Sequence, residues 1–185
     1  MRIDNERPSD EQLPSAIAKT GNLVWMNRDR LNDAGLGGLK TVAFGDLTIG
    51  GDLALAPGGA MDFTTSGNVT LDGSLSARGG SVSLVGGTGL FGDLHGLTVQ
   101  RGIVIDTRGL WTNAALDPAS AWGAAFRNGG TVTLVTNGAL QLESGSRIDA
   151  SAGAALLSNG SVLGGAGGDV SLSAGGLVID GGGTI

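Results

Sequence analysis

The stretch that decides the fold is residues 128–150, which read NGGTVTLVTNGALQLESGSRIDA. Three times within it, two apolar residues stand on either side of one polar residue, and glycine, asparagine or serine bounds each group. These pairs are Val132/Leu134, Leu140/Leu142 and Ile148/Ala150. Alternation with a period of two over so few residues is typical of a short strand that buries one face. The stretch therefore predicts three short strands joined by tight turns.

The same unit recurs along most of the chain, and successive pairs mostly begin five to eight residues apart. The other pairs are Val42/Phe44, Leu47/Ile49, Leu53/Leu55, Met61/Phe63, Val69/Leu71, Leu75/Ala77, Val82/Leu84, Leu97/Val99, Ile103/Ile105, Val170/Leu172 and Leu177/Ile179. Strands this short form poor hairpins, so an antiparallel sandwich is disfavoured. They suit a solenoid, in which each strand pairs in parallel with its equivalent one coil away. We therefore expect an all-β, right-handed parallel β-helix with three strands per coil.

The size of this solenoid follows from the spacing of the pairs. Three strands per coil predict a period of roughly 20 residues and roughly five coils, stacked at ~4.8 Å per coil into a rod about 25 Å long. Glycine, at 36 of 185 residues, suits the many corners because it accepts a positive φ. With 41% hydrophobic and only 15% charged residues, the chain has apolar surface to bury and is predicted to fold.

The composition changes near residue 35. The first 35 residues hold 11 of the 28 charged residues and only two glycines. We expect residues 1–21 to be a polar, partly disordered lead-in and residues 22–185 to form the β-helix, with a short ordered piece that carries Trp25 at its start. Two interruptions are predicted, a glycine-rich corner at 86–96 and an insertion loop at 110–128. The insertion contains Pro118, after which one helical turn is expected.

Three aromatic residues of the insertion are the candidate partner-contact residues, namely Trp111, Trp122 and Phe126. A role in capping the core is an equally good interpretation of them. Asn68 and Asn159 each begin an Asn-x-Ser/Thr sequence and are candidate glycosylation sites.

Catalytic and cofactor motifs are weak. A glycine pattern at 87–92 lacks the helix that a dinucleotide site needs, and Asp169 after the glycines at 164–168 is read as the polar entry to a strand rather than as a calcium ligand. Cysteine is absent and His95 is the single histidine. The aspartates stand singly beside turns, with no linear cluster of carboxylates and arginine. We therefore expect no catalytic residue, metal or cofactor, and no enzyme, although stacked coils could still assemble carboxylates for polysaccharide cleavage.

Charge and hydropathy limit the partners. The formal net charge of −6 argues against nucleic-acid binding, and no apolar run is long enough to span a membrane. The N-terminal residues are polar and acidic, so they do not look like a signal peptide.

Residues 128–134, 138–142 and 145–151, together with 31–36 and 108–113, resemble the coils of filamentous haemagglutinin-like exoproteins. This resemblance covers residues 22–185 and implies an internal rod segment of a secreted bacterial adhesin. It also implies export by two-partner secretion through an outer-membrane pore, localisation at the cell surface, and host-cell or bacterial surface glycans or proteins as partners. The Asn-Pro-Asn motifs of the family's secretion domain are absent. A polysaccharide-active β-helix enzyme, or the shaft of a contact-dependent toxin-delivery protein, remains an alternative.

Overall fold

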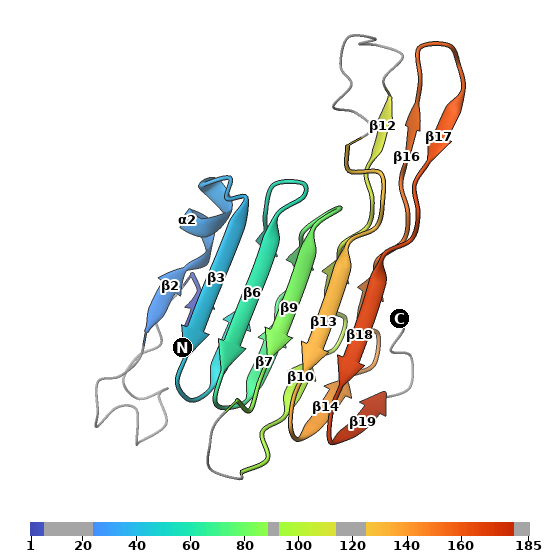
Figure 1. Ribbon diagram of the computed structural model, residues 1–185. Helices are drawn as coiled ribbons and strands as arrows, with labels where there is room; N and C mark the ends of the chain where they lie inside the picture. The colour runs from blue at the N-terminus through green and yellow to red at the C-terminus, as the bar shows by residue number, and fades with distance from the viewer. Residues whose placement is uncertain (6–23, 89–92, 114–124, 180–185) are drawn as a thin grey trace.

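The chain folds as a parallel β-solenoid, which confirms the predicted fold class. The computed structural model describes residues 1–5, 24–88, 93–113 and 125–179 (Figure 1). Three parallel sheets run along the stack of coils, and a fourth, smaller sheet projects from it. Strands that lie side by side in the long sheets come from successive coils, as the colour sequence in Figure 1 shows, except that residues 2–4 lie between residues 25–27 and residues 47–50 in one sheet.

Each long sheet collects one strand from each coil. The first contains β3 (Gly38–Ala43), β6 (Ala60–Thr65), β9 (Ser81–Val85), β13 (Thr131–Val135) and β18 (Asp169–Ser173). The second contains β1 (Arg2–Asp4), β2 (Trp25–Asn27), β4 (Leu47–Gly50), β7 (Val69–Asp72), β10 (Leu97–Val99), β14 (Ala139–Leu142) and β19 (Gly176–Ile179). The third contains β5 (Leu53–Ala54), β8 (Leu75–Ser76), β11 (Val104–Asp106) and β15 (Arg147–Asp149).

Register stays constant along the stack although the coils differ in length. In the second sheet Leu47 pairs with Val69, Val69 with Leu97, and Leu97 with Leu140. The first step spans 22 residues and the last spans 43. The predicted period near 20 therefore holds for the first coils, and the later coils are longer because they carry insertions at their corners.

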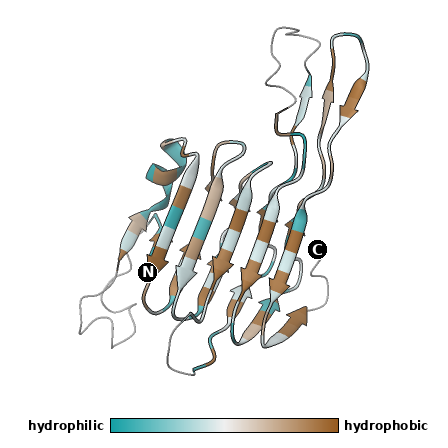
Figure 2. Cartoon of the chain, in the orientation of Figure 1, coloured by the Kyte–Doolittle hydropathy of each residue, from teal (hydrophilic) through white to brown (hydrophobic). Residues whose placement is uncertain are grey.

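The core is a continuous column of inward side chains. Phe63, Leu84 and Leu134 are fully buried neighbours along the first sheet, and outward residues alternate with them. Figure 2 shows this alternation as hydrophobic and hydrophilic bands along the strands. Each fully buried side chain of this size contributes about 1.5–3 kcal/mol through apolar burial.

The first predicted pair is wrong in phase. Val42 is 64% exposed and Phe44 is 93% exposed, whereas Leu39 and Thr41 are the inward residues, in register with Met61 and Phe63. A shift of one residue moves every side chain of a strand to its other face. The strand begins earlier than the apolar pattern suggested.

The N-terminal residues add a strand that the sequence analysis did not predict. β1 pairs with β4, and Ile3 is fully buried opposite Ile49. Residues 2–4 thus belong to the solenoid, not to the lead-in, whose residues 6–21 lie outside the described part. No helix among the described residues is long and apolar enough to cross a membrane.

A short helix, α2 (Arg28–Asp33), closes the third sheet at this end. The Asn27 side chain accepts a hydrogen bond from the Arg30 backbone and caps the helix. The Asn32 side chain then donates to the Asp52 carbonyl at 3.0 Å and accepts from the Ala54 amide at 2.9 Å. It covers the free edge of β5 in place of another strand.

Side chains at the corners continue the hydrogen bonding between strands. Asp46 Oδ1 accepts from the Asn68 amide at 2.8 Å, and Asn68 Oδ1 accepts from the Gly96 amide of the next coil at 2.8 Å. At another corner, Asp52 Oδ1 accepts from the Ser74 amide at 2.8 Å, and Ser74 Oγ from the Val104 amide at 3.2 Å. These bonds account for two of the aspartates that stand beside turns, Asp46 and Asp52.

Glycine is required where corners stack most closely. A Cβ built on Gly130 would lie 1.9 Å from the Gly80 carbonyl oxygen, and one on Gly73 would lie 2.0 Å from that of Gly51. Real Cβ atoms do not approach backbone atoms so closely. The coils can therefore stack at this distance only because positions 73 and 130 are both glycine.

Candidate contact surface and the ion-pair ladder

Three short strands form an arm that projects from the stack (Figure 1). They are β12 (Trp111–Asn113), β16 (Ala154–Leu156) and β17 (Val162–Gly164). β12 and β16 follow the third sheet in successive coils and pair in parallel, and β17 returns antiparallel to β16. The insertion predicted at 110–128 therefore does not form a lone loop, because its first strand finds a partner in the next coil.

Trp111, on β12, is 67% exposed. It is in register with Ala154 on β16, which is in register with Gly164 on β17, so one row across the arm holds the indole and two small residues. Val162, 59% exposed, occupies the next row on the same face of the arm, opposite Leu156. Trp111 does not cap the core, and its exposure fits the partner-contact interpretation.

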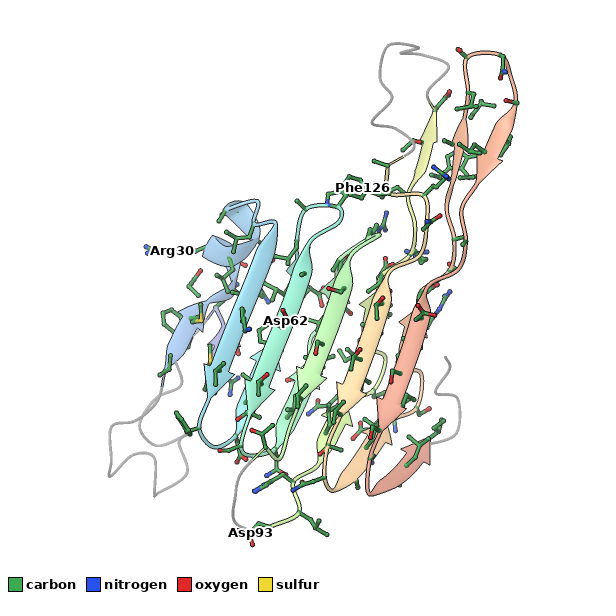
Figure 3. The ribbon with its side chains drawn as sticks, viewed as in Figure 1. Arg30, Asp62, Asp93 and Phe126 are labelled. Carbon is green, nitrogen blue, oxygen red and sulfur yellow. The ribbon has the colours of Figure 1, made fainter. Side chains whose placement is uncertain are left out.

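Phe126 behaves differently, since it lies over the corners of the solenoid (Figure 3). A Cβ on Gly58 would lie 2.4 Å from Phe126 Cε1, and one on Gly79 would lie 3.0 Å from Phe126 Cβ. The ring covers the Gly58 corner, the Cβ and backbone of Phe126 cover the Gly79 corner of the next coil, and Phe126 stays 36% exposed. For Phe126 the capping interpretation is favoured. Trp122 and most of the helical turn expected after Pro118 lie outside the described residues.

Stacking also assembles a cluster that the linear sequence does not show. Asp106 and Asp149 are register partners on β11 and β15. Arg108 lies between them, with Nε 2.9 Å from Asp106 Oδ1 and 3.6 Å from Asp149 Oδ2. Arg78 reaches Asp106 at 3.3 Å, and Arg147 pairs with Asp149. Carboxylates and arginines therefore do cluster here, contrary to the interpretation of single turn aspartates, and we call this cluster the ion-pair ladder.

The ladder keeps both carboxylates ionised. Burial alone would raise the pKa of Asp106, but hydrogen bonds from the Arg108 side chain and backbone, with the charges of Arg108 and Arg78, lower it below its ordinary value. Burial likewise opposes a lowered pKa at Asp149, where hydrogen bonds from Ser151 and the charges of Arg147 and Arg108 prevail. A general acid for glycoside cleavage needs a raised pKa, so this pair does not supply one.

The two Asn-x-Ser/Thr sites lie in different surroundings. Asn68 belongs to the corner hydrogen bonds of the stack, whereas Asn159 is at the tip of the hairpin between β16 and β17. Asp169 begins β18, as its interpretation as a strand-entry residue predicts. Among the described residues, no group of three or more His, Cys, Asp or Glu side chains is arranged to hold a metal ion.

No protein-family model, no curated protein and no solved structure matches this chain.

Proposed function

We propose that the chain is a structural and adhesive rod segment of a secreted bacterial surface exoprotein of the filamentous-haemagglutinin kind. It holds a contact surface away from the cell. The observation that carries this proposal is the arm of β12, β16 and β17, which projects from a regular stack and exposes Trp111 and Val162. The surface glycans or proteins of host cells or other bacteria are its proposed partners.

The stack supports the role of a stiff spacer. Parallel ladders run uninterrupted through five strands of the first sheet, and the corner side chains of Asp46 and Asn68 add bonds between the same coils. In a solenoid each coil contacts only its neighbours, so added coils lengthen the rod and leave the packing of the existing coils unchanged.

The arm supports the role in contact. Trp111, Leu156 and Val162 give one face an apolar surface, and the register neighbour of Trp111 on β16 is the small residue Ala154. Exposed tryptophan is enriched in the residues that contribute most to binding at protein interfaces. The same ring can stack on the apolar face of a sugar.

The direct test measures binding of the purified chain to arrayed glycans and to intact host and bacterial cells. We expect Trp111→Ala to weaken binding at least tenfold. Phe44→Ala is the matched control, because Phe44 is an exposed aromatic residue on the body rather than on the arm. Equal binding by Trp111→Ala and the unchanged chain would reject the arm as the contact surface.

A polysaccharide-active enzyme that uses an ionised carboxylate as a base is the second candidate, and the stacked carboxylates Asp106 and Asp149 are the observation in its favour. Its test is turnover of uronic-acid polysaccharides with and without calcium. Turnover that Asp106→Asn or Asp149→Asn abolishes would favour the enzyme over the adhesin. The shaft of a toxin-delivery protein would share the same coils, and the flanking sequence of the parent gene distinguishes it.

A further inference from the structure

We propose that Asn159 is the acceptor of an N-linked glycan in the folded protein and that Asn68 is not. The two residues share the Asn-x-Ser/Thr pattern, as Asn159-Gly160-Ser161 and Asn68-Val69-Thr70. What separates them is the use that the fold makes of each side-chain amide. This inference is independent of the adhesive role.

Asn159 lies in the turn of the β16–β17 hairpin. The Gly160 amide donates to the Leu157 carbonyl at 2.9 Å, and the Leu157 amide donates to the Ser161 carbonyl at 2.8 Å. Gly160 has a φ of 77°, the left-handed conformation that such hairpin turns require. Residues 158–161 are all exposed, and the arm carries them beyond the body of the solenoid (Figure 1). An enzyme can therefore approach the turn from outside the stack.

The side chain of Asn159 is held in place through its oxygen. Oδ1 accepts hydrogen bonds from the Ser161 amide at 2.9 Å and from Ser161 Oγ at 2.6 Å. No residue that the structure describes hydrogen-bonds its Nδ2. The serine of the acceptor pattern thus fixes the orientation of the amide and leaves the nitrogen available.

The donor is a sugar activated through an anomeric phosphate or pyrophosphate, which a glycosyltransferase supplies. Asn159 Nδ2 forms a bond to the anomeric carbon while the bond from that carbon to the phosphate oxygen breaks. The phosphate or pyrophosphate leaves with the electron pair of that bond. The displaced Nδ2 proton passes to a base of the transferase. No oxidation or reduction takes place.

Asn68 is engaged at both ends of its amide. Its Nδ2 donates to Asp46 Oδ1 at 2.9 Å, and its Oδ1 accepts from the Gly96 amide at 2.8 Å. These bonds join three successive coils. A transferase would have to break the corner bonds to present this nitrogen, so the folded solenoid protects it.

The test offers the folded chain and the urea-unfolded chain, diluted immediately before use, to a purified oligosaccharyltransferase with its lipid-linked donor. A reference Asn-x-Thr peptide checks the enzyme. Intact mass and peptide mapping then locate the glycan. We expect one glycan on the folded chain, at Asn159, and an additional glycan at Asn68 only after unfolding.

The variants sharpen the result. Asn159→Gln and Ser161→Ala should each abolish modification of the folded chain, whereas Asn68→Gln should leave it unchanged. A glycan at Asn68 of the folded chain, or none at Asn159 while the reference peptide is modified, would overturn the proposal. The melting temperature of the chain glycosylated at Asn159 should stay within about 2 °C of the unmodified chain, because the amide oxygen keeps its bonds to Ser161.

Discussion

Short strands have different surroundings in the first coils and in the arm. In the body, strands of two to six residues are stable because each is held between equivalent strands above and below and contributes to one buried column. In the arm, three strands of three residues pair with one another, and their apolar side chains Trp111 and Val162 stay in water. The arm strands are also paired in register, so the difference shows that the buried column between equivalent strands, not strand length, stabilises the body. A coil can carry an exposed insertion while its strands keep their register with the neighbouring coils.

The largest expected effect comes from a charge placed in the column. Leu134→Asp buries a carboxylate with no partner and should lower the free energy of unfolding by about 4 kcal/mol or more. Val162→Asp makes the same kind of change on the arm and should change it by less than about 0.5 kcal/mol. Urea unfolding followed by circular dichroism measures both. Similar losses in the two variants would mean that the arm belongs to the same cooperative core.

A smaller effect is expected from a single methyl group at a stacked corner. Gly130→Ala places a Cβ against the Gly80 carbonyl and should cost about 2–3 kcal/mol through overpacking. Gly164→Ala, on the arm, meets no atom within 4 Å and should change stability by less than about 0.5 kcal/mol. Thermal melts of the pair give the comparison. An unchanged melting temperature for Gly130→Ala would contradict the close stacking of the two corners.

The ion-pair ladder should make the body sensitive to acid. Asp106 and Asp149 have pKa values below their ordinary range in the folded chain, so their stabilisation is complete above the unfolded value of about 3.9 and is lost as pH falls through the folded values. Asp149→Asn should cost about 1 kcal/mol at pH 7, since its arginine partners are half-exposed and screened.

The measurement compares urea midpoints of Asp149→Asn and the unchanged chain at pH 7 and at pH 3. The gap between them should narrow at pH 3, and 1 M salt should also reduce it at pH 7. If the difference between the two urea midpoints widened at pH 3, the pKa of the Asp149 carboxylate would be raised rather than lowered in the folded chain.

The smallest effect on stability is expected for Trp111→Ala, within about 0.5 kcal/mol, because the indole is largely in water. Its predicted effect on partner binding is at least tenfold. Equilibrium unfolding and cell binding on the same preparation separate the two quantities. A large loss of stability would assign the ring a structural role instead.

Much of the fold could be predicted because its pattern is local. An apolar pair such as Leu140 and Leu142 identifies both a strand and its buried face, and glycine identifies the corners. The phase of β3 was predicted wrongly because Val42 and Phe44 are apolar but exposed, and inward Thr41 is polar. β1 was missed because three residues in a polar segment carry little pattern, although Ile3 lies deep in the column.

The candidate sites depend on separations that the sequence does not display. Asp106 and Asp149 are 43 residues apart and become neighbours only because insertions of unequal length leave the register unchanged. The β16–β17 hairpin did carry a signal, since Asn159-Gly160 between apolar segments is typical of a hairpin turn.

Five corner side chains of the first coils each accept a hydrogen bond from the coil that follows, whereas Ser66 accepts one from the coil before it. The acceptors on Asn32, Asp46 and Asp52 each receive an amide from the coil that follows in the sequence. Asn68 and Ser74 then do the same for the coil after that. Before the next coil folds, each acceptor is hydrated and lies beside an unpaired strand edge. The end of a partly folded stack therefore presents hydrogen-bond acceptors with which the next coil can pair. A chain ordered from its N-terminal end would extend coil by coil and would meet, at each step, acceptors already positioned by the coil before.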